Sequence, residues 1–88
     1  PVTLLVNSAS LFLDDEVATL KMKPYDDHQA VNLRAPVFLA QAFAGALPPD
    51  RSGLVVNIVD QRVLNPDPLF FSYALSKAGL WWATRTLA

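Results

Sequence analysis

The sequence has no cysteine and a single histidine, His28, among its 88 residues. It therefore lacks the residues for a disulfide framework or for a zinc site of cysteine and histidine ligands. Charged residues are scarce too, at 17% of the chain against roughly 25% in average soluble domains. Seven basic residues stand against eight acidic ones, the net charge is −1, and the sequence has no basic run. We expect no bound metal and no nucleic-acid partner.

Long hydrophobic runs are also missing. A membrane-spanning helix needs roughly 18 or more consecutive apolar residues, and the apolar stretch Ala35–Ala40 already ends at Gln41. The sequence also lacks internal repeats, low-complexity segments and a signal-peptide pattern. We expect no membrane partner, and a cytoplasmic location is the default expectation.

What the sequence has in excess is apolar residues, at 52%. A domain of this length buries only about 60% of the surface of its unfolded chain, so it normally needs a larger polar fraction outside. The chain also begins without methionine, at Pro1-Val2-Thr3, and ends at Ala88 inside a helical pattern. We therefore expect residues 1–88 to be one part of a single larger domain.

Two short apolar runs predict strands, at residues 2–6 and 53–59. Both lack polar alternation, which is typical of strands covered on both faces, as in parallel sheets. A helix is predicted from about Tyr25 to Leu47, because two aspartates fall in its first turn and a glycine and two prolines mark its end. A second helix is predicted from near Ser72 to Ala88, after a loop with two prolines.

This order of strand, helix, strand and helix predicts an α/β fold, namely a βαβα portion of a doubly wound, Rossmann-like parallel sheet. Two helices can cover only one face of such a sheet. Ligands of these sheets bind beyond the carboxyl ends of the strands. Asn7-Ser8-Ala9-Ser10 follows the first strand there, and Asp60-Gln61-Arg62 follows the second. Position alone leaves open whether these segments bind a ligand or only end the strands.

Tyr73 and Lys77 stand four residues apart on the second predicted helix, so their side chains lie on one face, one turn apart. The ammonium group and the positive end of the helix dipole would both favour the phenolate. We therefore predict that the pKa of Tyr73 falls from about 10 towards neutrality, as a general acid–base requires.

Asn32 lies inside the first predicted helix, four residues before Pro36. Because proline has no N–H, the carbonyl of Asn32 loses its normal helical donor. That carbonyl could then hold a water molecule in a proton path. Alternatively, Pro36 could only kink a helix that packs around the sheet, and the sequence leaves both readings open.

Four motifs follow one another along the chain: Leu5–Ser10, Val31–Pro36, Val56–Asp60, and Tyr73 with Lys77. In this order and spacing they resemble the N-N-A-G segment, the asparagine helix, the fifth strand and the Y-x-x-x-K motif of the short-chain dehydrogenase/reductase family. The resemblance covers nearly the whole chain. It implies the part of a Rossmann domain from the fourth strand to the fifth helix, without the N-terminal nucleotide loop and the C-terminal substrate loop.

Two departures from the majority pattern narrow the resemblance. Asp60 stands where most members have serine, and Ser8 and Ser10 replace the second asparagine and the glycine of N-N-A-G. These replacements resemble the pteridine reductase branch and bacterial dihydromonapterin reductases, in which an aromatic residue at the position of Phe12 stacks on the pterin. The resemblance therefore implies an NAD(P)H-dependent reductase of a small pterin or folate-like substrate.

The resemblance also implies catalytic roles for four residues. Tyr73 would protonate the substrate, and Lys77 would lower the pKa of Tyr73 and bind the nicotinamide ribose. Asp60 would contact the substrate and help to deliver the proton, while Asn32 would hold a relay water.

Binding roles follow from the same resemblance. The implied cofactor is NADP(H), with NAD left open, and its binding residues are Asn7, Ser8, Ala9, Ser10, Tyr73 and Lys77. The implied substrate contacts are Ser10, Phe12, Asp60 and Tyr73. The two helices are implied to form the interface of a homotetramer.

Two other functions stay open on the sequence alone. One is a carbonyl or alcohol oxidoreductase of the same family, in which Asp60 takes over the hydrogen-bonding role of serine. The other is a non-catalytic fragment that cannot bind the cofactor because it lacks the phosphate loop.

The remaining conspicuous side chains are predicted to have structural roles. We place Phe38 and Phe43 in the core or between helices, and Trp81-Trp82 in the core or a subunit interface. His28 is predicted on a helix surface or at an interface, and Asp14-Asp15-Glu16 on a solvated loop edge.

Overall fold

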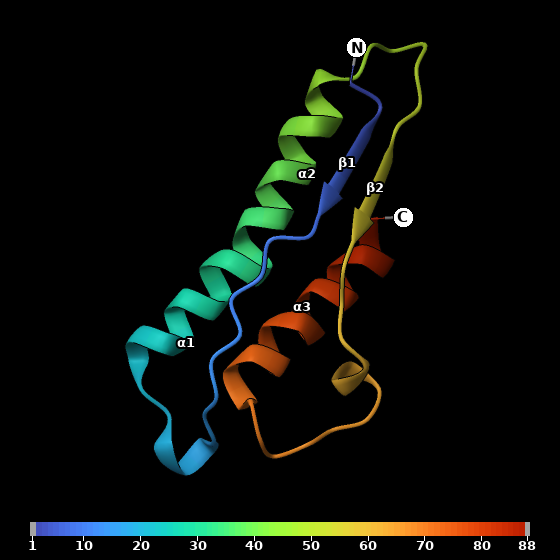
Figure 1. The fold of residues 1–88 in the computed structure, drawn as a ribbon. Helices are drawn as coiled ribbons and strands as arrows, with labels where there is room; N and C mark the ends of the chain where they lie inside the picture. Colours follow the sequence, from blue (N-terminus) through green and yellow to red (C-terminus); the bar gives the residue numbers. More distant parts are fainter. Residues whose placement is uncertain (1, 88) are drawn as a thin grey trace.

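A computed structural model describes residues 2–87 and contains one parallel strand pair with long helical segments beside it (Figure 1). The molecule is elongated and measures 50 × 25 × 17 Å. Its strands and α-helices are β1 (Leu4–Asn7), α1 (Met22–Gln29), α2 (Ala35–Ala46), β2 (Leu54–Asn57) and α3 (Phe71–Leu87). The order of these elements and the parallel pairing confirm the predicted fold class.

The two strands pair in register, with Leu4 opposite Leu54 and Asn7 opposite Asn57. Leucine and valine form both strands, and an asparagine ends each of them. The backbone N–H of Ile58 donates to the carbonyl oxygen of Asn7 at 3.2 Å, just beyond the last pair. The carboxyl ends of β1 and β2 therefore meet at one edge, and the two polar segments that follow start from neighbouring points.

The helices α1 and α2 join through a π-helical turn, Ala30–Arg34, into one continuous helical segment. The predicted start at Tyr25 was too late, because Lys21 has an extended backbone and the helix begins at Met22. Pro24 then falls in the first turn, where proline is tolerated since the N–H groups there have no partner within the helix. The segment ends at Ala46, next to the predicted end.

The helix α3 begins at Phe71, one residue before the predicted start, and its predicted end at Ala88 lies outside the described residues. Phe70 precedes it with a φ of 53°, in the left-handed region that a bulky side chain rarely adopts. Its N–H donates to Oδ1 of Asp14 at 3.3 Å, and its carbonyl accepts the N–H of Ala74 at 2.8 Å. This sharp entry sets the direction of the first turn of α3.

The helices cover one face of the strand pair and leave the other face open, as two helices must. Leu4 and Val6 of β1 are 53% and 50% exposed, whereas the alternate residues Leu5 and Asn7 are half-buried and buried. Leu54 of β2 is 60% exposed. The apolar strands predict helices on both faces of the sheet, but within residues 2–87 only one face is covered.

No helix in that range combines the length and the apolar composition that crossing a membrane requires.

The interior between the helical segments is mainly polar. Among the described residues, the buried apolar side chains are those of Pro36, Ala40, Tyr73 and Leu80. The buried polar or charged ones are Asn7, Asp15, His28, Asn32, Ser72, Ser76 and Lys77. Within residues 2–87, the buried contacts between these helices therefore include several hydrogen bonds between side chains.

The predicted core position of Phe38 was wrong, because its side chain is 59% exposed. Phe43 is half-buried and lies against Gly53. Of the two tryptophans, Trp81 is half-buried and Trp82 is exposed, which agrees with their predicted different directions.

Candidate active site

Tyr73 and Asp60 meet at the carboxyl end of β2. Asp60 caps the short 3-10 helix Gln61–Val63, and its Oδ1 accepts the backbone N–H of Arg62 at 2.9 Å. Tyr73 is buried in the first turn of α3, and its hydroxyl donates to Oδ2 of Asp60 at 3.0 Å. Two of the predicted catalytic residues therefore form a donor–acceptor pair.

Lys77 lies one turn after Tyr73 on α3, as the spacing predicts, and is buried. Its Nζ donates to the carbonyl oxygen of Ile58 at 2.9 Å and stands 6.0 Å from the centre of the Tyr73 ring. Burial lowers the pKa of Lys77, and the negative charge of Asp60 opposes that shift. The ammonium group is thus fixed at the end of β2, beside the phenol.

The pKa of Tyr73 is raised above its ordinary value of 10.0, so the predicted fall was wrong. Burial of the phenol is the largest cause, and the hydrogen bond to Asp60 and the charge of that carboxylate raise the pKa further. The prediction counted Lys77 and the helix dipole but omitted burial and the neighbouring carboxylate. Tyr73 is therefore a phenol that keeps its proton at neutral pH.

Arg62 fixes the carboxylate of Asp60 from the other side. Its Nη1 lies 3.2 Å from Oδ2 and 3.4 Å from Oδ1 of Asp60. The backbone hydrogen bond from Arg62 is the main cause that holds the pKa of Asp60 below its ordinary value of 3.8, with the hydrogen bond from Tyr73 and the ion pair adding to it against the effect of burial. Asp60 is therefore an anion at neutral pH and accepts the hydrogen bond of the Tyr73 phenol.

An aromatic wall borders this pair. The ring of Phe12 meets the ring of Tyr73 edge-on at 4.5 Å and stacks on the ring of Phe70 at 4.4 Å. The guanidinium of Arg62 lies 5.7 Å from the Phe12 ring centre and 5.0 Å from that of Phe70. Phe12 is half exposed, so part of its ring is open to a ligand. The sequence analysis missed Phe70, and the aromatic pair just ahead of the second predicted helix was the available signal.

Asn32 is fully buried within the π-helical turn. Its side chain accepts the N–H of Leu11 at 2.8 Å and donates to the carbonyl of Leu11 at 2.8 Å and to Oγ of Ser76 at 3.1 Å. The side-chain amide therefore holds the loop next to Phe12, whereas the sequence analysis considered only the backbone carbonyl. The π-helical turn ends two residues before Pro36, and such turns are frequent at functional sites.

Four of the predicted cofactor residues lie at the end of β1, and they differ in exposure. Asn7 is buried and donates to Oδ1 of Asn57 at 2.7 Å, and Asn57 in turn binds a side chain of α3. Ser8, Ala9 and Ser10 are exposed. The end of β1 and the facing helix enclose a hollow of about 240 Å³, lined by Leu5, Val6, Asn7, Ser8, Ala9, Val31, Ala35, Pro36 and Leu39.

A second buried cluster adjoins Tyr73. His28 is fully buried, with its Nδ1 2.6 Å from Oγ of Ser72, and Ser72 donates its hydroxyl and its N–H to Asp15 at 2.5 and 2.8 Å. The predictions of a surface His28 and a solvated Asp15 were therefore wrong. Ser72 lies 44 residues from His28 and 57 from Asp15 in sequence, so no local pattern indicated these contacts.

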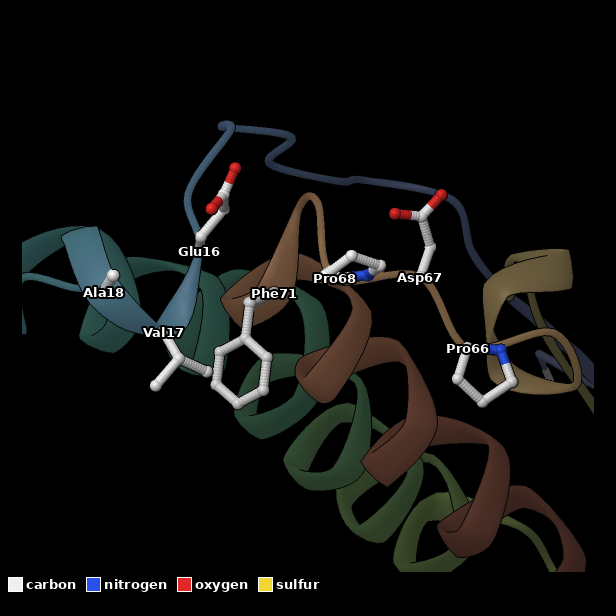
Figure 2. A pocket seen from close by; sticks show the side chains of 7 residues that line it. All are labelled: Glu16, Val17, Ala18, Pro66, Asp67, Pro68 and Phe71. Carbon is white, nitrogen blue, oxygen red and sulfur yellow. The ribbon is translucent and has the colours of Figure 1, made fainter.

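A separate, open hollow of about 460 Å³ lies beside the start of α3 (Figure 2). Its lining is mainly apolar and consists of Glu16, Val17, Ala18, Pro66, Asp67, Pro68 and Phe71. It includes none of the predicted site residues, and Figure 2 shows the ring of Phe71 next to Val17. Within residues 2–87 no three histidine, aspartate or glutamate side chains come together as metal ligands would.

A parallel strand pair with polar segments at its carboxyl edge, followed by a helix that carries Tyr73 and Lys77, defines part of a Rossmann-like α/β protein. Within this class, the chain belongs to the short chain dehydrogenase family, whose profile matches residues 1–88. The family predicted from the four motifs is thereby confirmed.

Relatives with solved structures agree with this assignment. FolM alternative dihydrofolate reductase 1 from Brucella canis and its counterpart from Brucella suis, each in complex with NADP, match with a TM-score of 0.97 and 59% sequence identity. Both matches cover 100% of this chain and 36% of the other. The L-xylulose reductase of Caenorhabditis elegans is 34% identical over 90 residues, which cover 100% of this chain and 36% of that protein. This chain thus spans about a third of the length of these relatives.

Proposed function

We propose that this chain is part of an NADPH-dependent reductase that delivers a hydride to a pterin or folate-like substrate. The observation that carries the proposal is the hydroxyl of Tyr73 donating to the carboxylate of Asp60 at 3.0 Å, beside the half-exposed ring of Phe12. The likeness to the NADP-bound dihydrofolate reductases of Brucella supports the same cofactor and substrate class.

The donor–acceptor pair suits a nitrogen heterocycle. One edge of a pterin offers both N–H donors and ring-nitrogen acceptors, whereas a simple ketone offers only an acceptor oxygen. An ionised Asp60 only accepts hydrogen bonds, and the Tyr73 hydroxyl can donate one. A flat ring can in addition stack on an aromatic face such as the open part of Phe12. A ketone oxygen could accept the hydrogen bond of the Tyr73 hydroxyl, but it has no N–H or O–H to donate to the carboxylate of Asp60.

The pair also supplies the proton that the reduction consumes. Hydride adds to the carbon of a ring C=N bond, and the nitrogen takes a proton. Because its pKa is raised, Tyr73 is protonated at neutral pH and can act as the proton donor when the substrate binds. Once Tyr73 has given that proton up, the ammonium of Lys77 stabilises the phenolate. We retain Asn32 as the residue whose backbone carbonyl holds a relay water.

The residues at the end of β1 fit the nicotinamide end of the cofactor, which supplies the hydride when bound. Asn7 is buried and fixed to Asn57, so the strand end is rigid. Ser8 and Ala9 are small and exposed at the rim of the 240 Å³ hollow, which leaves their backbone groups accessible to a cofactor. Lys77, held at the end of β2, is the residue that we expect to bind the ribose hydroxyls.

The test is NADPH oxidation by the full-length protein with dihydrobiopterin, dihydromonapterin and dihydrofolate, beside a simple ketone. We expect turnover of at least one pterin or folate, and turnover of the ketone alone would contradict the proposal. Tyr73→Phe should lower kcat by about 100-fold or more, because it removes the proton donor. NADPH binding, followed by its fluorescence, should persist in that variant and so exclude a folding defect.

A carbonyl or alcohol oxidoreductase is the second candidate, favoured by the likeness to L-xylulose reductase. If this chain belongs to such an oxidoreductase, Asp60 would take over the hydrogen-bonding role of the serine that most family members have. Asp60→Ser separates the two functions, because ketone reduction should survive the change in a carbonyl reductase. In a pterin reductase the same variant should lose most of its pterin turnover.

A further inference from the structure

Two side chains of one helical segment hold the same stretch of loop. Oδ1 of Asn32 accepts the N–H of Leu11 at 2.8 Å, and Nε2 of His28 accepts the N–H of Leu13 at 3.0 Å. His28 and Asn32 lie four residues apart, so they stand one above the other on the helix. The residue between the two anchored amides is Phe12, the proposed stacking residue.

The same spacing repeats on the facing helix α3. His28 contacts Oγ of Ser72 at 2.6 Å, and Asn32 donates to Oγ of Ser76 at 3.1 Å. Both serines also lie four residues apart, and all four side chains are fully buried. Two parallel sets of hydrogen bonds thus join the loop, the first helical segment and α3. We call them the His28 layer (His28 and Ser72) and the Asn32 layer (Asn32 and Ser76). Tyr73 lies between the two serines in sequence.

The direction of the hydrogen bonds in the His28 layer follows from its donors. Nε2 of His28 accepts from a backbone N–H, so the neutral ring carries its proton on Nδ1 and donates it to Ser72. The hydroxyl of Ser72 then donates to Oδ2 of Asp15, which also accepts the N–H of Ser72 through Oδ1. Every polar atom of this layer has a partner when His28 is neutral. Protonation of Nε2 would place a hydrogen against the N–H of Leu13.

Burial favours that neutral form. It lowers the pKa of His28 below the ordinary 6.5, although Asp15 of the loop and Asp27 of the same helix raise it. The ring of Tyr73 faces His28 from α3 at a centre-to-centre distance of 6.1 Å.

We infer that His28 and Ser72, with Asp15, are positioning residues that hold Leu11–Leu13 against the two helices and thereby set the ring of Phe12 beside Tyr73. The inference deepens the proposed function, since it takes Phe12 as a wall of the substrate site. Asn32 fixes one side of Phe12 and His28 the other. Removing the His28 layer should therefore loosen substrate binding without removing the proton donor.

Amide hydrogen exchange of the full-length protein tests the positioning role without any substrate. Ser72→Ala and His28→Leu should speed exchange in Leu11–Leu13 by about tenfold, because each removes a buried hydrogen bond. His28→Asn should retain more protection than His28→Leu, since an asparagine at position 28 can both accept and donate hydrogen bonds, as Asn32 does. Asp26→Asn, an exposed change on the same helix, should leave exchange unchanged. In wild type, the protection of this segment relative to its intrinsic exchange rate should decrease as the pH falls below 6.5.

Steady-state kinetics supply the second readout. Ser72→Ala should raise KM for the pterin about fivefold or more, with kcat and the KM for NADPH within about twofold of wild type. Unchanged exchange in Ser72→Ala would overturn the inference, as would a fall in kcat with KM unchanged. Faster exchange throughout α1 and β2 would also overturn it, since the layer would then only stabilise the fold. If exchange responds as expected but no pterin is turned over, the proposed function fails and the positioning role stands.

Discussion

The hydrogen bond between Tyr73 and Asp60 sets the ionisation of both groups. It helps to hold the pKa of Asp60 below its ordinary value, and with burial it raises the pKa of Tyr73. Across the neutral range the pair therefore holds one proton, on the phenol, next to an ionised carboxylate. In the proposed reduction, this state would keep the proton on Tyr73 until the substrate replaces Asp60 as the acceptor of its hydrogen bond.

Asp60→Asn should lower the pKa of Tyr73, because it removes the negative charge that raises it. The phenolate absorbance during alkaline titration, taken as the difference from Tyr73→Phe, measures this pKa. The folded pKa of wild type lies above 10.0, so the protonated phenol contributes stability that is complete below pH 10 and is lost as the pH rises through the folded value. Asp67→Asn, an exposed change in the loop before α3, is the matched control. An unchanged or raised pKa in Asp60→Asn would contradict this account.

At the residue scale, the resemblance to the family, and not spacing alone, brought Tyr73, Lys77 and Asp60 into one candidate site, and the structure places the three side chains close together. The sequence could not predict the direction of the Tyr73 pKa, because burial and the position of Asp60 arise only in the folded chain. His28 and Asp15 show the same limit. The sequence around each of them is typical of a polar surface residue, and partners distant in sequence compensate for their burial: Ser72 for both, and the N–H of Leu13 for His28.

Among the elements, the connection from α2 to β2 depends on a close contact at Gly53. A Cβ built on Gly53 would lie 2.7 Å from the Phe43 ring and 2.9 Å from Leu47, whereas one built on Gly45 would meet nothing within 4 Å. A side chain at position 53 would therefore have to displace Phe43 and Leu47. Gly45 lies within α2, where glycine is unfavourable.

The two glycines should respond to alanine with opposite signs. Gly53→Ala should destabilise the full-length protein by about 1 kcal/mol, since Phe43 and Leu47 must move to make room. Gly45→Ala should stabilise it by about 0.5–1 kcal/mol through higher helix propensity. Denaturant unfolding of both variants measures the difference. Stabilisation by Gly53→Ala would contradict this prediction, because it would show that the Phe43 ring can move aside with no loss in the free energy of unfolding.

The strands and helices themselves could be predicted because apolar runs, prolines and glycines mark them locally. The π-helical turn at Ala30–Arg34 could not. Pro36 signalled a disturbed hydrogen-bond pattern, and the sequence left a kink and a free carbonyl as alternatives. The turn places Asn32 where its side chain reaches both the loop and α3, and that placement depends on tertiary contacts with Leu11 and Ser76.

At the scale of the whole molecule, residues 2–87 expose two apolar surfaces. One is the open face of the strand pair, with Leu4, Val6 and Leu54. The other consists of exposed apolar side chains on the helices, namely Phe38 of α2 and Trp82 and Leu87 of α3. Doubly wound sheets carry helices on both faces, so we expect other parts of the full-length protein to cover the strand face. That leaves the helical surface for contact with a second copy of the chain.

The full-length protein should therefore be an oligomer, a tetramer by the family resemblance, joined through α2 and α3. Phe38→Glu and Trp82→Glu should each shift the mass measured by light scattering during size-exclusion chromatography towards smaller species, because a buried interface does not tolerate an unpaired charge. Val17→Glu places the same charge on an equally exposed apolar residue outside these helices and should leave the mass unchanged. A monomeric wild type, or an oligomer that survives both changes, would show that this helical surface has another use.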